Sequence, residues 1–418
     1  MSSVFDIQHE RCAGGDVHKK TVVACRRYPD GRGNFTVETR SFRTMTKDLL
    51  ALLDWLMEVG CTHFAMESTG DYWKPVYNIL EGNLELLVVN AKHIKNVPGR
   101  KTDRVDAQWI AKLLQVGLLR GSFVPPVGQR ELRDLTRHRT NFVRERTNMV
   151  NRLQKVLETA NIKLASVATD VMGVSGRAML QAIIEGTSDA TTMADLAKGR
   201  MRTKKDDLAD ALDGRVKDHH RFILAELLTQ IDGINETIDR FNTEIEKLMA
   251  PFKEGAALLA TITGVGEVAS QVIVSELGTD MSVFATDAHA AAWAGVAPGN
   301  HESAGKRGSG RVRQGNQTLR RTLIQCTHAA VKTKGTYLAA QYHRLAGRRG
   351  KKRAIMAVAH SILVSAYHML KNKVTYQDLG GNYFDKLNRK GTTARLLQRL
   401  QDMGLTVTVQ EQVSALAA

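Results

Sequence analysis

The stretch from residue 12 to residue 43, CAGGDVHKKTVVACRRYPDGRGNFTVETRSFR, predicts how the N-terminal part of the chain folds. Two strand patterns, Cys12–Val17 and Thr21–Arg26, are followed by a turn signal at Pro29-Asp30-Gly31 and a third strand near Phe35–Arg40. Short connections favour antiparallel pairing of successive strands. We therefore expect three neighbouring strands in one sheet.

Helices and strands alternate after this trio. The expected order is a helix over Lys47–Val59, a strand at His63–Met66, a helix over Tyr72–Leu80, a strand at Leu84–Val89, and a helix from Thr102 to about Gln115. Such an order favours an α/β domain, in which a mixed sheet is covered by helices. A linker with two prolines, Ser122–Gly128, follows it.

The middle of the chain, residues 129–250, is expected to be almost wholly helical. One apolar seam alternates spacings of three and four residues, as in a coiled coil: Leu224, Leu227, Ile231, Ile234, Ile238, Phe241, Ile245 and Leu248. This seam can pair within the chain, against residues 129–158, or between protomers. Composition changes again near Pro251, so we expect three parts: 1–125, 126–250 and a mostly helical 251–418.

Composition narrows the class of protein. The 418 residues include 43% hydrophobic side chains, which excludes a disordered chain. We find no apolar run near the roughly 20 residues of a membrane span and no signal peptide, and four cysteines are too few for a disulfide framework. We expect a cytoplasmic protein that does not enter a membrane.

The net charge of +16 is concentrated in two segments. Residues 301–353 carry 14 Lys and Arg against one acid, and residues 130–155 carry eight against three. Clusters of this kind gain affinity for phosphate backbones by releasing counterions, without specifying a sequence. Nucleic acid is therefore the expected partner, although solvated helix faces are the alternative.

Four acids are placed where a sheet and a helix can bring carboxylates together. Asp16 ends the first strand, Glu67 ends the strand after the first helix, and Asp103 and Asp106 share one face of a helix. Carboxylate oxygens are suited to hard divalent cations, and two such ions can assist phosphodiester cleavage. Each acid taken alone is more often a surface residue.

The C-terminal part contains two glycine-rich segments. Gly264 and Gly266 separate two helical stretches, and such a hairpin can present backbone N–H groups to a phosphate or can simply be a turn. The basic loop around residues 298–307 holds Ser303, and Ser309 follows it. A serine there could attack phosphorus, and spacing alone does not distinguish the two.

These motifs together resemble the DEDD transposases of bacterial insertion sequences, a group that includes pilin-inverting recombinases. The resemblance covers nearly the whole chain. It rests on GDVHK at 15–19, MESTG at 66–70 with Tyr72-Trp73, KTDRVDA at 101–107, Gly264-Val265-Gly266, AWAGVAP at 292–298, the Ser303 loop, and Gly315-Asn316 with Leu319-Arg320. Where the family often has Ser-Ser-Gly-Gly, this chain has Glu302-Ser303-Ala304-Gly305.

The resemblance implies a ribonuclease-H-like N-terminal domain of the RuvC type, a coiled-coil middle and a C-terminal transposase domain. It implies DNA cutting and rejoining, with Ser303 as the nucleophile. Asp16, Glu67, Asp103 and Asp106 would hold Mg²⁺ or Mn²⁺. It also implies a homodimer or homotetramer, which binds double-stranded DNA at element ends and target and takes a structured non-coding guide RNA from the element. In a bacterial cell it would be nucleoid-associated when acting.

Two other functions remain open on the sequence. The first is a RuvC-type nuclease in which water attacks, and the second is a basic scaffold that is not an enzyme. In each case the side chains and glycines expected to contact nucleic acid are the same: Lys101, Arg104, Arg137, Arg139, Arg144, Arg146, Gly264, Gly266, Lys306, Arg307, Arg311, Arg313, Arg320 and Arg321.

Overall fold

A computed structural model describes residues 6–68, 70–90, 106–187, 189–299, 302–303, 305–307, 310, 312 and 314–408. The chain divides into two compact units, Met1–Pro125 and Pro126–Ala418. Each unit has its own layers and core.

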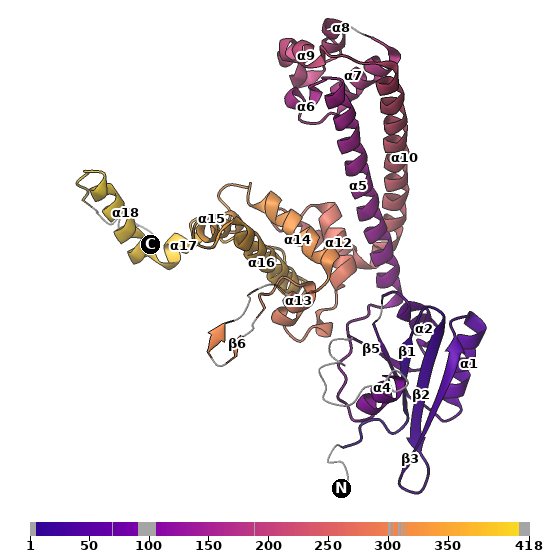
Figure 1. Ribbon diagram of the computed structural model, residues 1–418. Coiled ribbons are helices and arrows are strands. Elements are labelled where there is room, and N and C mark those ends of the chain that lie inside the picture. Colours follow the sequence, from indigo (N-terminus) through magenta and orange to yellow (C-terminus); the bar gives the residue numbers. More distant parts are fainter. Residues whose placement is uncertain are drawn as a thin grey trace. The chain divides into compact units, whose positions relative to one another are not determined.

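The first unit is a five-stranded mixed sheet with helices on both faces (Figure 1). Its strands are β1 (Cys12–Val17), β2 (Thr21–Pro29), β3 (Phe35–Arg43), β4 (His63–Glu67) and β5 (Glu85–Val89). They lie in the order β3-β2-β1-β4-β5. The pairs β3–β2 and β2–β1 are antiparallel, and the pairs β1–β4 and β4–β5 are parallel. The expected hairpin trio and mixed α/β sheet are confirmed.

Alternate residues of the strands face two different cores. Helices α1 (Thr46–Met57) and α2 (Trp73–Leu80) cover one face, where Ala13, Phe64 and Met66 are buried. Helix α4 (Asp106–Gln115) covers the other face, where Cys12 and Ala65 contact Ile110 and Leu114. This alternation follows from the two-residue period of a strand, so each strand position has a fixed side of the sheet.

Gly14 lets α4 approach β1 closely. A Cβ atom at this position would lie 2.4 Å from the backbone nitrogen of Ala111 and 2.6 Å from the backbone oxygen of Ala107. No real Cβ makes such contacts, so any larger residue here pushes the helix off the sheet.

The second unit is helical. Its longest helices, α5 (Val127–Thr159) and α10 (Asp218–Leu248), pack along each other (Figure 1). Between them in sequence come α6 (Leu164–Val167), α7 (Val174–Glu185), α8 (Ala190–Ala194), the 3₁₀ helix η2 (Gly199–Lys204) and α9 (Lys205–Leu212). These short helices bury Met179, Leu180 and Leu208 in one core with Leu224 and Ile231 of α10.

The apolar seam of α10 is used within the chain. Phe241 lies 5.3 Å from Phe142 of α5 between ring centroids. Leu224, Ile231 and Ile245 are buried. Of the two pairings that the sequence left open, the structure shows the one against residues 129–158.

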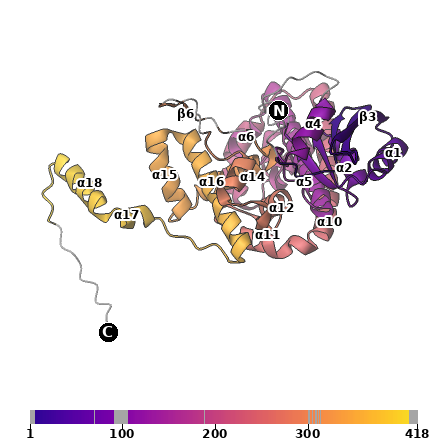
Figure 2. The ribbon, with the colours of Figure 1, turned by 90° about the horizontal axis from the view of Figure 1, so that it is seen from below.

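The rest of the unit is a bundle in which α15 and α16 lie side by side (Figures 1 and 2). Its elements are η3 (Ala250–Phe252), α11 (Lys253–Ala260), α12 (Glu267–Leu277), η4 (Met281–Val283), α13 (Asp287–Ala294), the strands β6 (Glu302–Ser303) and β7 (Lys306–Arg307), α14 (Gln317–Ala330), α15 (Tyr337–Arg349), α16 (Lys351–Asn372), α17 (Tyr383–Leu387) and α18 (Arg389–Asp402). The expected parts 126–250 and 251–418 belong to one unit, because α5 packs against α12.

Helix α16 is the one described helix that is long and apolar enough to cross a membrane. The mean hydropathy of its most apolar 18 residues is 1.3, and half of that window is buried inside the fold. It packs against α11, α13, α14 and α15, as a core helix of a bundle does.

Gly14→Ala is expected to lower the free energy of unfolding by about 1–3 kcal/mol, because the added methyl group overpacks the β1–α4 contact. Urea denaturation followed by circular dichroism measures the change. Gly121→Ala is the matched control in the same unit, since a Cβ there meets only Leu87, at 3.8 Å. Equal stability of the two variants would show that α4 does not rest on Gly14.

Candidate catalytic face and the network behind the serine loop

Asp16 and Glu67 lie at the ends of two neighbouring parallel strands. The register of β1 with β4 pairs Gly15 with Met66, so Asp16 and Glu67 are the next residues of their strands. The Asp16 side chain is 19% exposed, and its Oδ2 lies 3.1 Å from Nε2 of His18. The carboxyl ends of β1 and β4 therefore carry two carboxylates at neighbouring positions.

Both acids face the side of the sheet that α4 covers. Asp16 shares its face with Cys12 and Gly14, and Glu67 shares its face with Ala65. The Cys12 thiol contacts the backbone oxygen of Ala111 at 3.7 Å.

Helix α4 runs against the direction of β1. The contacts move from Ala111, beside Cys12, to Ala107, beside Gly14. The first turn of α4, which contains Asp106, therefore lies toward the Asp16 end of β1. Three acids from three elements thus occupy one face and one end of the sheet.

The other residues of the paired-acid motif, Lys101, Asp103 and Arg104, lie outside the residues that the structure describes. Among the residues that are described, no three His, Cys, Asp or Glu side chains form a preformed metal site. The donors that are in place, carboxylate oxygens, are those that Mg²⁺ and Mn²⁺ bind.

Ser303 belongs to a short hairpin that the sequence did not predict. Strands β6 and β7 pair antiparallel, with Glu302 opposite Arg307 and Ser303 opposite Lys306. Two residues remain between Ser303 and Lys306, and the second, Gly305, has φ +75°, a value that glycine adopts without strain. A glycine two residues after Ser303 was the signal for this turn. Ser309, Arg311 and Arg313 lie outside the described residues.

The first basic segment is engaged inside the protein to an extent that charge counting did not reveal. Arg139, expected to contact nucleic acid, is 3% exposed. Its guanidinium donates to Gln271 at 2.7 Å and to Asn242 at 3.2 Å. Burial lowers its pKa. Arg146 donates to Asn235 of α10 at 2.6 Å. Arg139 thus donates to side chains of α12 and α10, and Arg146 donates to α10. The burial of Arg139 corrects its interpretation as a phosphate contact.

Gly264 also has a packing role in place of the expected phosphate contact. A Cβ there would lie 2.5 Å from the backbone nitrogen of Ala330 and 2.5 Å from the oxygen of Cys326, so the glycine lets the α11–α12 turn rest on α14. Gly266, by contrast, is exposed at the start of α12. Among the other expected contact residues, Arg144, Lys306 and Arg321 are exposed and Arg320 is half-buried.

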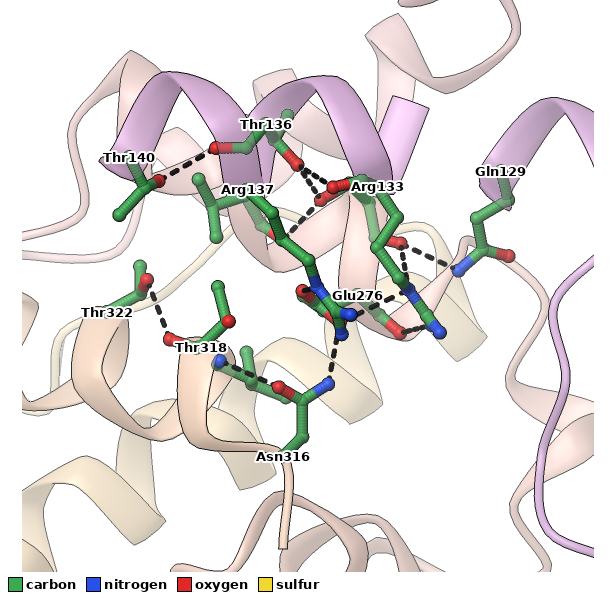
Figure 3. Close-up of polar contacts among 12 residues, drawn as sticks. Gln129, Arg133, Thr136, Arg137, Thr140, Glu276, Asn316, Thr318 and Thr322 are labelled. Atoms are coloured by element: carbon green, nitrogen blue, oxygen red, sulfur yellow. Dashed lines mark hydrogen bonds and ion pairs between the residues drawn. The ribbon is translucent and has the colours of Figure 1, made fainter. Parts of the chain in front are cut away.

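A fully buried acid, Glu276 of α12, organises the contacts behind the serine loop (Figure 3). Arg137 of α5 donates from Nε to Oε1 at 2.6 Å and from Nη2 to Oε2 at 2.8 Å. Arg133, one turn earlier, lies 3.1 Å from Oε2 and donates to the Glu276 backbone oxygen at 2.6 Å. Asn316 donates from Nδ2 to Oε2 at 2.6 Å. Three donors from two other segments thus converge on one carboxylate.

Neutral hydrogen bonds continue this contact between α5 and α12. Gln129 donates to the Ser275 backbone oxygen at 3.0 Å, and the hydroxyls of Thr136 and Ser275 lie 2.9 Å apart (Figure 3). Burial lowers the pKa of Arg133 to about 10, an effect that the Glu276 carboxylate opposes. Arg133 therefore stays charged at neutral pH.

Sequence analysis missed Glu276 and Arg133 and assigned Arg137 to nucleic acid. The sequence signal was an acid near the end of a stretch without other charged residues, VASQVIVSEL at 268–277. A buried acid needs a cation, but the sequence does not say which arginine supplies it.

Two known families match separate parts of this chain. Residues 13–162 match a family described as "Transposase", and residues 256–344 match the "Transposase IS116/IS110/IS902 family". The first match spans the three acids of the sheet, and the second spans Glu276 and the serine loop. The fold, the acids and these matches define the chain as a DNA transposase.

Two relatives are similar over most of their own length. The "Transposase for insertion sequence element IS1111A" of Coxiella burnetii is 25% identical over 329 residues, 77% of this chain and 80% of the relative. A "Probable family 20 transposase" of Pseudomonas aeruginosa is 26% identical over 266 residues, 62% of this chain and 68% of the relative. The chain belongs to the IS110 family of insertion-sequence transposases. Membership implies DNA binding and dependence on a divalent metal.

Glu276→Ala is expected to lower the free energy of unfolding by about 3–5 kcal/mol, because it leaves Arg133 buried without its counter-charge. Thermal and urea unfolding of the second unit measure the loss. Glu254→Ala, at an exposed position of α11, is the control and is expected to change stability by less than about 0.5 kcal/mol. If the Glu276→Ala protein were as stable as the control, the Glu276 network would not contribute to the stability of the second unit.

Proposed function

We propose that this transposase cuts and rejoins DNA strands by transesterification, with Ser303 as the nucleophile and Asp16, Glu67, Asp103 and Asp106 as ligands of Mg²⁺ or Mn²⁺. The observation that carries the proposal is the meeting of Asp16, Glu67 and the α4 turn of Asp106 on one face of the sheet. Acidic side chains that only solubilise the surface are not expected to lie on the same face and at the same end of the sheet.

The strand order supports a ribonuclease-H-like fold for the first unit. An antiparallel trio continued by two parallel strands, β3-β2-β1-β4-β5, puts the carboxyl ends of β1 and β4 side by side. The acids at these ends lie on the face that α4 covers, and the first turn of α4 contains a further acid, Asp106. A bound divalent cation would neutralise charge that develops on the phosphate oxygens there.

The reaction that fits Ser303 conserves the number of phosphodiester bonds. The Oγ atom attacks phosphorus, loses its proton to solvent or a nearby base, and forms a phosphoserine ester, while the bond from phosphorus to one strand oxygen breaks. Attack by the hydroxyl of another strand on this ester restores a DNA linkage and releases serine. The exposure of Gly305 and Lys306, next to Ser303 in the hairpin, supports this role, because a nucleophile needs access to the strand.

The charged segments support nucleic-acid partners. Residues 301–353 keep most of their basic side chains exposed, among them Arg321, Arg344, Arg348 and Arg349. We assign this segment to double-stranded DNA at element ends and target and to a structured guide RNA. The working protein is a homodimer or homotetramer in the bacterial cytoplasm, and it associates with the nucleoid when it acts.

Asp16→Asn is expected to abolish strand cleavage and leave nucleic-acid binding unchanged, because it removes a ligand charge but alters no basic side chain. Gel assays of nicking and binding, with element DNA, RNA and Mg²⁺, measure the two properties. Asp54→Asn, on the exposed side of α1, is the control. Cleavage by the Asp16 variant at the control's rate would overturn the metal-site proposal.

Ser303→Ala is expected to abolish the covalent protein–DNA adduct that survives denaturation, whereas Ser309→Ala keeps it. The adduct forms only if serine, and not water, attacks phosphorus, so the same gel separates the recombinase from a RuvC-type nuclease. Cleavage without any adduct in the unsubstituted protein would favour the nuclease. Neither cleavage nor adduct would favour the non-enzymatic scaffold.

A further inference from the structure

We propose that Glu276, acting through Asn316, is a positioning residue that holds the base of the Ser303 loop in a fixed place. The inference rests on the proposed role of Ser303 and names a second requirement of the same site. The contacts that carry it come from α5, α12, α13 and the start of α14, within the part of the chain that the structure describes.

The two ends of the serine loop are clamped to each other. A Cβ at Gly315 would lie 2.5 Å from both the Gly295 nitrogen and the Trp293 oxygen, so the two chain segments touch through their backbones. The Asn316 backbone nitrogen donates to the Trp293 oxygen at 2.9 Å. The loop that carries Ser303 therefore leaves and re-enters the fold at one point. Closing a loop at its base restricts where its tip can go.

This base is in turn tied to Glu276. The Asn316 side chain has two tasks: its Oδ1 accepts the Leu319 N–H at 3.1 Å and caps α14, while its Nδ2 donates to Glu276 Oε2 at 2.6 Å. The cap fixes the residue at which α14 begins. The bond to Glu276 fixes the position of that residue against α12.

The other end of the loop base meets the same network. The Arg133 guanidinium carbon lies 5.9 Å from the centre of the Trp293 ring, within cation–π range. Arg133 also contacts Glu276 at 3.1 Å. Both ends of the loop thus rest on side chains that bind one buried carboxylate.

A buried ion pair fixes the geometry of its partners more than it stabilises the fold. Removing two charges from water offsets most of their attraction, so an apolar contact of equal size is often as stable. The charged contact differs in that it accepts few geometries, since a bidentate guanidinium fixes both carboxylate oxygens. Arg137 holds Glu276 in this way, and Oε2 is then aimed at Asn316.

Asn316→Asp tests the tie without removing the helix cap. Aspartate caps a helix as well as asparagine does, but it places a second carboxylate oxygen where Nδ2 donates to Glu276. We expect the rate of Ser303 adduct formation to fall by roughly 10- to 100-fold, in the range that a displacement of about 1 Å costs a reacting group. Hydrogen exchange of residues 296–315 is expected to become faster, while α14 keeps its protection.

Asn388→Asp is the matched control. Asn388 also caps a helix, α18, by accepting the Gly391 N–H at 3.3 Å, so the same substitution is made away from Glu276. This variant is expected to form the adduct at the unsubstituted rate.

The double variant E276Q/N316D reverses the direction of the bond, because the glutamine amide can donate to the aspartate. It is expected to recover at least several-fold of the adduct rate lost in N316D. Assays at a temperature where thermal unfolding shows every variant folded separate positioning from loss of structure.

The outcomes are distinct from those of the proposed function. If the unsubstituted protein forms no Ser303 adduct, the nucleophile assignment fails, and only loop exchange then tests the tie. If the adduct forms but N316D matches N388D in both adduct rate and loop exchange, the positioning role is overturned. Loss in N316D with no recovery in the double variant also overturns it, since general damage at Asn316 would then explain the loss.

Discussion

The Glu276 carboxylate has no exposed surface, and two arginines and an amide replace the water that it lost. Those partners come from α5 and from the segment that enters α14. A single buried carboxylate therefore brings together three parts of the second unit, of which Arg137 of α5 lies 139 residues and Asn316 lies 40 residues from Glu276 in sequence. The long helical hairpin, the α11–α12 pair and the serine loop all meet at this point.

The first unit depends on a simpler steric constraint. Two glycines in β1 leave room on both sides of the sheet, Gly14 for α4 and Gly15 for the Phe64 ring. The close approach of α4 is what sets Asp106 over the same face as Asp16 and Glu67. The face on which these acids lie is thus set by strand register and by the packing of α4 on β1.

The basic charge of this transposase divides by location. In α5 several arginines are used to hold helices together, as Arg139 and Arg137 show, although they belong to a segment that charge counting assigned to nucleic acid. In residues 301–353 the basic side chains are mainly exposed. The net charge of a segment gives its excess of basic over acidic side chains. Burial decides how many of the basic side chains are exposed and able to contact a partner. The C-terminal segment is therefore the better candidate for contact with DNA.

The sheet was predictable from local pattern, because strand period, turn residues and the run of short connections act over a few residues. The places of Asp16 and Glu67 near strand ends were predictable for the same reason, whereas the expected helix start at Thr102 lies outside the described residues. The tight β6–β7 turn was missed, although Gly305 was a local signal for it. Glu276 was missed because nothing near it in sequence neutralises it.

The sequence by itself determined the alternation of helices and strands, the candidate acids, the apolar seam of α10 and the total charge. Only the tertiary structure decided which arginines turn inward, that the seam pairs with α5, that Gly264 packs on α14, and that Glu276 ties α5 to the serine loop. The physical reason is that desolvation depends on every element around a side chain, whereas strand and helix propensities depend on neighbours along the chain.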